Sequence, residues 1–303
     1  MRRFFIFLIF FILILIFLKL GSLSKIEGFY FVKNFNFGDN KEINILLLGK
    51  PGANYIGGEN TDSILIAHYN LEKKHLILIP IPRDLVVYNS KNNLVKINGL
   101  YAEKEIETLL KKASDYSGLK IRKYIAFDIY LVESLVDYLG GLEVEIKEPV
   151  IDAVTFYTIY PGKKLLNGDL IELVLRSRHH PEGDFFRIKN QIEVIKALKD
   201  KIISLSEKDK TKILKFFLDN KKHWQTNLTL EEIYNLASLK NDLNQIKIDY
   251  LLLDTKNGFL TSNYFTINNT NGVYGIYPKL GIDNYSGIQQ YLRSRIEILE
   301  NQK

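Results

Sequence analysis

The strongest constraint on the fold is a set of three short, nearly uninterrupted apolar runs between residues 44 and 81. They cover Asn44–Gly49, Ser63–Tyr69 and His75–Ile81. Apolar runs of this length, bounded by loop-forming residues, are typical of strands buried on both faces. Residues 70–74 join the last two runs and predict a hairpin, whereas the Gly- and Asn-rich stretch 50–60 predicts a loop. The chain must therefore cover both faces of a sheet.

Segments with helical periodicity supply that cover. We expect helices over 104–117, 130–139, 168–175, 184–203, 229–239 and 288–299, and further strands over 142–146 and 246–253. Gly140-Gly141 ends one helix, and Thr229-x-x-Glu232 forms a capping box at the start of another. Because helices and strands interleave and one strand pair is antiparallel, we predict an α/β fold with a mixed central β-sheet flanked by helices on both faces.

The N-terminus predicts export. Phe4–Leu18 is an unbroken apolar run of 15 residues that follows Arg2 and Arg3. Positive charge before such a run places the N-terminus in the cytoplasm. We therefore expect a cytoplasmic tail over 1–3, one transmembrane helix over 4–20, a linker over 21–42 and an extracytoplasmic domain over 43–303. The alternative is a cleaved signal peptide with a weak small-x-small site at residues 22–24.

Composition excludes several classes of site. The chain has 303 residues and no Cys, and its five His residues show no HExxH spacing, so a zinc site is not expected. Its formal net charge is 41 − 35 = +6, which either has no functional meaning or reflects attraction to anionic lipids and wall polymers. No run of Lys and Arg exceeds two residues. Together with export, this argues against nucleic acid as a partner.

Arginine is used sparingly. The chain has nine Arg among 41 basic residues, which leaves 41 − 9 = 32 Lys. Four of the Arg could converge on one cleft together with Lys96 and Gln191: Arg83, Arg176, Arg178 and Arg187. In extended chain the guanidinium groups of Arg176 and Arg178 point the same way. Asp184, Arg187 and Gln191 share one helix face. Several Arg forks suit a ligand with more than one negative charge, such as a diphosphate.

Asp62 and Asp84 stand where the predicted strands begin and end. Such carboxylates could hold a divalent cation against the phosphates, because Mg²⁺ bridges carboxylate and phosphate oxygens. Simpler interpretations remain for each feature. An Arg-Asp pair is usually a surface salt bridge, an Arg-x-Arg pair a solvated edge, and a Thr-Asp dipeptide a turn.

The order of these segments resembles the LytR–CpsA–Psr family of envelope proteins. The matching segments span about 150 residues: Asn44–Gly49, Thr61-Asp62-Ser63, Ile81-Pro82-Arg83-Asp84, Lys96-Ile97-Asn98 with Tyr101, Leu135–Gly141, Leu166-Asn167-Gly168, Arg176-Ser177-Arg178, and Gly183–Ile188 with Gln191. The chain also departs from the family pattern. Lys50-Pro51-Gly52 stands where the family often has an Asp, and Asn60 and Asn190 stand where it often has Arg. Glu59 is a candidate for the missing carboxylate.

The resemblance implies a membrane-anchored phosphotransferase of cell-envelope assembly. Such an enzyme moves a glycopolymer from a polyprenyl diphosphate carrier onto peptidoglycan, with Mg²⁺ assisting and an apolar pocket in the sheet core taking the prenyl chain. Carried over, the diphosphate ligands are Arg83, Lys96, Arg176, Arg178, Arg187 and Gln191; Asp62 binds Mg²⁺ or activates the acceptor, and Arg83 is also catalytic. Two alternatives stay open. One is a polyprenyl diphosphate phosphatase, and the other is a non-catalytic sensor of anionic lipid or wall polymer.

Overall fold

The computed structural model describes residues 41–302, without 54, 56, 230, 231, 234, 235 and 237–244. The predicted tail 1–3, the predicted transmembrane helix 4–20 and nearly all of the linker 21–42 lie outside the described residues. Within the part that is described, no helix has both the length and the apolar character that crossing a membrane requires.

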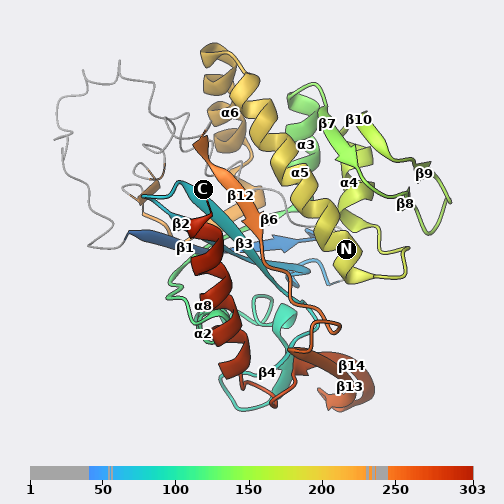
Figure 1. The fold of residues 1–303 in the computed structure, drawn as a ribbon. Coiled ribbons are helices and arrows are strands. Elements are labelled where there is room, and N and C mark those ends of the chain that lie inside the picture. Colours follow the sequence, from blue (N-terminus) through green and yellow to red (C-terminus); the bar gives the residue numbers. More distant parts are fainter. Residues whose placement is uncertain are drawn as a thin grey trace.

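The centre of the molecule is a six-stranded mixed sheet (Figure 1). Its strands are β1 (Glu42–Lys50), β2 (Ser63–Asn70), β3 (His75–Ile81), β6 (Lys123–Asp128), β11 (Trp224–Thr226) and β12 (Lys247–Tyr250), in the order β11-β6-β1-β2-β3-β12. The hairpin of β2 and β3 is antiparallel, whereas β6 pairs parallel with β1 and β12 parallel with β3. The predicted mixed sheet and its hairpin are therefore confirmed.

Helices cover both faces of this sheet, as predicted. One layer holds α3 (Ile129–Tyr138), α4 (Gly168–Arg176), α5 (Asp184–Ser204) and α6 (Glu207–Asp219), and the other holds α2 (Ile106–Ser117) and α8 (Ser286–Asn301) (Figure 1). Alternate residues of β1 point to opposite faces. Ile45 and Leu47 join the core under the first layer, and Leu46 and Leu48 join the core under the second.

Small elements surround these layers. They are the strand pairs β4 (Val86–Tyr88) with β5 (Leu94–Lys96), β7 (Leu142–Ile146) with β10 (Gly162–Leu166), β8 (Val150–Ile151) with β9 (Thr158–Ile159), and β13 (Leu260–Ile267) with β14 (Thr270–Pro278), and the 3₁₀ turns η2 (Ile97–Gly99) and η3 (Lys221–His223). The β13–β14 ribbon packs beside β4 through a bridge between Leu85 and Ile276.

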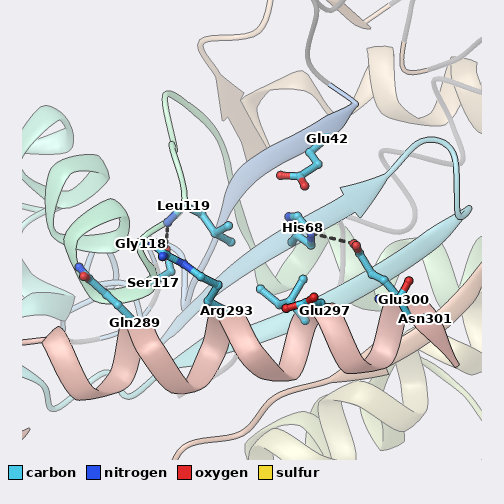
Figure 2. A pocket seen from close by; sticks show the side chains of 11 residues that line it. Glu42, His68, Ser117, Gly118, Leu119, Gln289, Arg293, Glu297, Glu300 and Asn301 are labelled. Carbon is cyan, nitrogen blue, oxygen red and sulfur yellow. Dashed lines mark hydrogen bonds and ion pairs between the residues drawn. The ribbon is translucent and has the colours of Figure 1, made fainter.

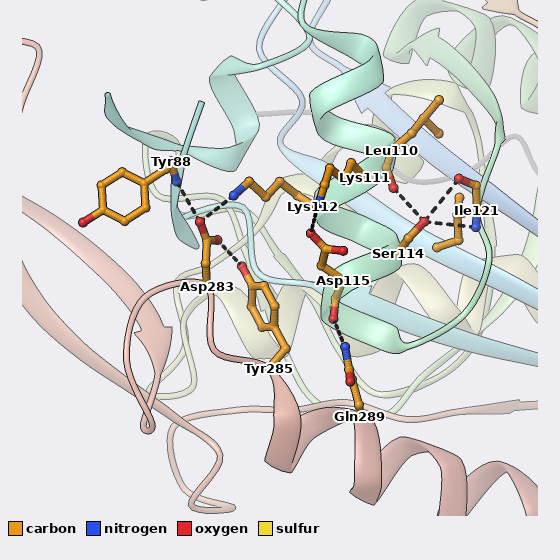
Figure 3. Close-up of polar contacts among 10 residues, drawn as sticks. All are labelled: Tyr88, Leu110, Lys111, Lys112, Ser114, Asp115, Ile121, Asp283, Tyr285 and Gln289. Atoms are coloured by element: carbon orange, nitrogen blue, oxygen red, sulfur yellow. Dashed lines mark hydrogen bonds and ion pairs between the residues drawn. The ribbon is translucent and has the colours of Figure 1, made fainter. Parts of the chain in front are cut away.

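One partly buried carboxylate holds the start of α8 against the rest of the fold. Asp283 accepts hydrogen bonds from the Tyr285 hydroxyl at 2.9 Å and from the backbone N–H of Tyr88, and it pairs with the Lys112 ammonium of α2 (Figure 3). Gln289 of α8 also donates to the carbonyl oxygen of Asp115 on α2. The loop before α8 is thereby held against both α2 and β4.

The ends of the strands form two opposite edges of the sheet, where an edge is such a row of strand ends and not an outermost strand. The carboxyl ends of β1, β3 and β6 and the start of β2 lie at the same edge, because Gly49 pairs with Ser63, Ile64 with Ile81, and Lys50 with Asp128. In α/β folds, ligands bind outside the carboxyl ends of the parallel strands. Of the residues singled out in the sequence as site candidates, Asp62 precedes β2 and Arg83 follows β3 at this edge.

Candidate functional site

The first component of the site is an ion pair between the ends of two neighbouring strands. Asp62 precedes β2 and is 6% exposed, and its Oδ1 lies 2.8 Å from the Nη1 of Arg83, which follows β3. The segment before Asp62 is fixed to the loop after β5, because both the backbone N–H and the hydroxyl of Thr61 donate to the carbonyl oxygen of Asn98. Three of the segments that carry the family resemblance therefore meet here.

Arg187 joins the helical layer to this pair. Its side chain is 2% exposed, and its Nη2 donates to the backbone carbonyl oxygen of Asp62 at 2.9 Å. The same nitrogen lies 2.8 Å from the Oδ1 of Asp184, one turn earlier on α5. The predicted shared face of Asp184 and Arg187 is confirmed, because the i, i+3 spacing brings them into contact.

Arg178 is the least compensated cation of the cluster. Its nearest described carboxylate oxygen is the Oδ1 of Asp184 at 3.8 Å, an atom that Arg187 engages more closely. Burial, and then the neighbouring charges of Arg83 and Arg187, lower the pKa of Arg178 to about 10. A guanidinium in this position would be stabilised by an additional negative charge.

The pKa of Arg83 is shifted in the opposite direction. Burial acts to lower its pKa and is the largest single effect, but the carboxylates of Asp62, Asp84 and Asp184 together outweigh it and raise the pKa. Asp84 also accepts from the ammonium of Lys96 at 2.7 Å. Lys96 therefore reaches the cluster through Asp84.

Two predicted residues stand apart from this cluster. Arg176 is the last residue of α4, and it pairs with Glu172 at 2.6 Å and lies over the Tyr55 ring of the loop after β1. Arg176 is still helical, so the prediction that Arg176 and Arg178 point the same way from an extended chain is wrong. The two guanidinium groups contact different partners. Gln191 is 1% exposed, and its amide donates to the carbonyl oxygen of Leu175 at 3.3 Å, which ties α5 to the end of α4.

A small cleft lies at the Asp62–Arg83 ion pair. It is lined by Asp62, Ser63, Ile64, Pro80, Ile81, Arg83, Asp184, Arg187 and Ile188. The ion pairs join four cations, namely Arg83, Arg178, Arg187 and Lys96, to three carboxylates, namely Asp62, Asp84 and Asp184. The balance of 4 − 3 = +1 favours an anion as the ligand.

A resident cation would need help from that anion. Among the described residues, no group of three or more His, Asp and Glu side chains could hold a metal ion. Asp62 already contacts Arg83, and Glu59 pairs with Lys50 at 2.6 Å. The described carboxylates at this edge are each paired with a cation, which fits Mg²⁺ only if phosphate oxygens supply most of its ligands.

Comparison with known proteins identifies the family of this chain. The LytR_cpsA_psr family profile matches residues 22–274. The chain belongs to the LytR_cpsA_psr family. Regulatory protein MsrR of Staphylococcus aureus is 29% identical over 166 residues, which are 54% of this chain and 50% of MsrR. Biofilm regulatory protein A of Streptococcus mutans is 28% identical over 214 residues, which are 63% of this chain and 51% of that protein. The chain spans about half the length of these curated relatives.

Solved structures share the fold of this LytR_cpsA_psr protein. Lin1025 of Listeria innocua has a TM-score of 0.61 and 24% identity, covering 87% of this chain and 100% of Lin1025. TagT bound to LIIa-WTA has a TM-score of 0.63 and 21% identity, covering 89% of this chain and 93% of TagT. The mixed α/β architecture is therefore that of the family.

Some of the family-like segments prove to be structural. The Oδ1 of Asp137 accepts from the backbone N–H of Gly168 at 2.7 Å, so Leu135–Gly141 and Leu166-Asn167-Gly168 meet where α3 packs on α4. Conversely, the contribution of Asp184 as a shared partner of Arg178 and Arg187 was not predicted. Its spacing from Arg187 signals one helix face, but its contact with Arg178 depends on the turn between α4 and α5.

A larger cavity lies elsewhere. Its volume is about 310 Å³, and it is lined by residues at the start of β1, on β2, after α2 and on α8 (Figure 2). His68 lies at its floor, between the side-chain oxygens of Asn44 at 2.8 Å and Glu300 at 3.2 Å. Because this cavity is at the amino end of β1, it lies at the edge of the sheet opposite the Arg cluster, and none of the predicted site residues lines it.

Proposed function

We propose that this protein is a membrane-anchored phosphotransferase that moves a glycopolymer from a polyprenyl diphosphate carrier onto peptidoglycan. The observation that carries the proposal is Arg178, a partly buried guanidinium whose nearest carboxylate among the described residues is 3.8 Å away and whose pKa is lowered by burial and by two neighbouring Arg. Family membership and the likeness to TagT, a protein solved with LIIa-WTA bound, support a glycopolymer as the cargo.

The proposed substrate contacts follow from the cluster. Arg83, Arg178 and Arg187 would hold the diphosphate, with Lys96 supporting it through Asp84. Arg176 would be the outer member, because it is 40% exposed and would leave Glu172 to meet the substrate. Gln191 would act by positioning, because its buried amide holds the end of α4 beside Arg176 and Arg178.

The chemical role of the cluster is charge stabilisation. During phosphoryl transfer, negative charge spreads over the phosphate oxygens and the leaving group. Fixed guanidinium groups stabilise that charge without reorganising. Magnesium would be held by Asp62 together with phosphate oxygens and would supply further neutralisation of the same charge. The membrane-anchored, extracytoplasmic location rests on the apolar run Phe4–Leu18.

The deciding experiment is a transfer assay with the full chain in detergent. The donor is a short-chain prenyl diphosphate that carries a disaccharide, and the acceptor is a soluble peptidoglycan fragment. We expect a phosphodiester-linked product and prenyl monophosphate, and both should be lost in Arg178→Gln. Free sugar phosphate formed without the acceptor would indicate the phosphatase instead. Tight donor binding with no product would indicate a sensor, a possibility that the names of the two regulatory relatives favour.

Location is tested separately. A reporter fused after Lys303 should be active only outside the cytoplasm, and the mature chain should retain Arg2 and Arg3. A mature N-terminus near Lys25 would replace the proposed anchor with a cleaved signal peptide.

A further inference from the structure

A second polar arrangement lies along the same edge of the sheet as the Arg cluster. Asp128 ends β6, and its Oδ2 lies 2.7 Å from the Nδ1 of His223, the last residue of the turn before β11. Both side chains are largely buried, at 14% and 16% exposure. Neither residue belongs to the family-like segments on which the proposed site rests.

The geometry fixes the protonation of the imidazole. An ionised carboxylate can only accept hydrogen bonds, so a neutral His223 carries its proton on Nδ1 and has a lone pair on Nε2. The Nε2 atom is buried and has no hydrogen-bond partner among the described residues. Asp128 is itself held, because its Oδ1 accepts from the backbone N–H of Leu131 at the start of α3. The pair is therefore an oriented base whose accepting atom is unused.

Strand register gives the distance of this pair from the Arg cluster. Asp128 pairs with Lys50 at the end of β1, and the adjacent Gly49 pairs with Ser63, next to Asp62. Two strand spacings of about 4.8 Å separate Asp128 from Ser63, or roughly 10 Å. Because the strand order is β11-β6-β1-β2-β3, the backbone of His223 beside β11 lies about four spacings, or roughly 19 Å, from that of Arg83 after β3. The long Arg side chains, the phosphate and the acceptor oxygen together span the distance to the Nε2 of His223. An in-line attack needs the attacking oxygen on the side away from the leaving group.

We propose that Asp128 and His223 form the general base of the transfer reaction, an inference that rests on the proposed function. The Nε2 of His223 takes the proton of the acceptor hydroxyl while the oxygen of that hydroxyl bonds to the phosphorus next to the glycan. The bond from that phosphorus to the bridging oxygen breaks, and the bridging oxygen leaves on the prenyl monophosphate. The imidazolium then returns its proton to water.

The surroundings of the imidazole define how the acceptor reaches it. The ring of Tyr130 lies 4.4 Å from the imidazole and is 51% exposed, so Tyr130 is the group that must turn aside. Ionisable groups beside the pair include Lys50, which pairs in register with Asp128 and is held by Glu59, and Lys221 and Lys222 on the turn of His223. An aromatic ring beside the base also suits a sugar hydroxyl as the acceptor.

The test compares two His-Asp pairs in the full chain. His75 also contacts a carboxylate, Asp249, at 2.8 Å, but it starts β3 at the opposite edge of the sheet. With the disaccharide prenyl diphosphate and peptidoglycan fragment, His223→Gln should slow transfer about 100-fold. Donor affinity should stay within about twofold, and His75→Gln should keep the parental rate. The parental rate should fall as the pH is lowered, because a protonated imidazole cannot accept a proton, and His223→Gln should lack that fall.

Two further variants separate chemistry from folding. Added imidazole should restore part of the transfer by His223→Ala, and Asp128→Asn, which keeps an oxygen for Leu131, should also be slow. A His223→Gln protein with the parental rate and pH profile overturns the base while leaving the proposed function intact. The base is also overturned if the variant is slow but unfolds at a lower denaturant concentration, still loses rate as the pH is lowered, and is not rescued by imidazole. A parental chain that neither transfers nor hydrolyses the donor overturns both proposals.

Discussion

Arg187 donates to the backbone carbonyl oxygen of Asp62 at 2.9 Å and so connects α5 to the start of β2. The contact lies within the fold, since the Arg187 side chain is 2% exposed. The same guanidinium therefore serves two purposes: it holds the helical layer on the sheet, and it fixes the backbone from which the Asp62 carboxylate projects. Changes at Arg187 and at its more exposed neighbour Arg178 should consequently have different effects.

The first prediction concerns stability at Arg187. Arg187→Lys keeps the charge but cannot reach the Asp62 carbonyl oxygen and Asp184 with the same fork. We expect the free energy of unfolding to fall by about 1–3 kcal/mol, because a buried acceptor loses its donor. Urea denaturation measures the change, with Lys201→Arg at the end of α5 as the surface control. A variant as stable as the control would show that the contact contributes little.

The second prediction compares Arg178 with Arg176. Arg178→Lys should weaken binding of a disubstituted diphosphate by roughly tenfold, the effect of losing one charged hydrogen bond of about 1.5 kcal/mol. Arg176→Lys should weaken it less, because Arg176 must first leave Glu172. Both proteins should unfold at nearly the parental denaturant concentration. Calorimetric titration decides the order, and equal losses would mean that Arg176 lies as deep in the bound site as Arg178.

Much of this architecture could be predicted from the sequence. The apolar runs of β1, β2 and β3 identified the sheet, and the reciprocal bonds between Thr229 and Glu232 confirm the predicted capping box, although most of the helix over 229–239 lies outside the described residues. The strand expected over 246–253 is only Lys247–Tyr250. Beyond it, Leu251 still donates its backbone N–H to the carbonyl oxygen of Leu78 on β3, whereas Leu253 is buried by packing.

Other elements left weaker signals. β6 reads KYIAFD, and only three of its six residues are fully buried, so it lacks the long apolar run of its neighbours. The ribbon of β13 and β14 faces solvent along much of its length. In the site, the residue types of the Arg cluster were predictable. The separate orientation of Arg176 was not, because it depends on one more residue remaining helical at the end of α4.

The third prediction concerns Asp62 and magnesium. A carboxylate beside phosphate oxygens repels them unless a cation intervenes. Asp62→Asn should therefore reduce transfer about 100-fold or more, while donor binding is largely retained because the Arg remain. Magnesium should bind weakly to the protein alone and more tightly with the diphosphate, because the described residues supply no cage of their own. Titration of Mg²⁺ with and without the diphosphate measures this, and parental transfer by Asp62→Asn would remove the proposed role.

The fourth prediction concerns the pH dependence of binding. The pKa of Arg178 is lowered to about 10, chiefly by burial, so this group is still cationic at pH 7–9 and loses its charge only as the pH rises through about 10. Affinity for a disubstituted diphosphate, which does not itself titrate in this range, should be constant from pH 7 to 9 and fall above 10. Arg178→Gln should reduce the fall. A steep loss of affinity between pH 7 and 9 would contradict the assignment.

The fifth prediction separates a structural segment from the site. An added methyl at Gly168 would lie 2.7 Å from both the Asp137 carboxylate and the Glu133 carbonyl oxygen. Because the neighbour includes backbone, α4 must shift away from α3, and Gly168→Ala should lower the free energy of unfolding by about 1–3 kcal/mol. Gly287→Ala on α8 is the control, since its added methyl would meet only a side-chain carbon at 3.6 Å.

Diphosphate affinity should distinguish the two possible roles of this glycine. Gly168 begins the helix that ends in Arg176, but the partner of Arg178, Asp184, belongs to α5 and not to the start of α4. The folded fraction of Gly168→Ala should therefore bind the diphosphate within about twofold of the parental affinity. A stable Gly168→Ala protein would show that α3 and α4 can separate at low cost. A stable protein with much weaker binding would instead place Gly168 in the binding site.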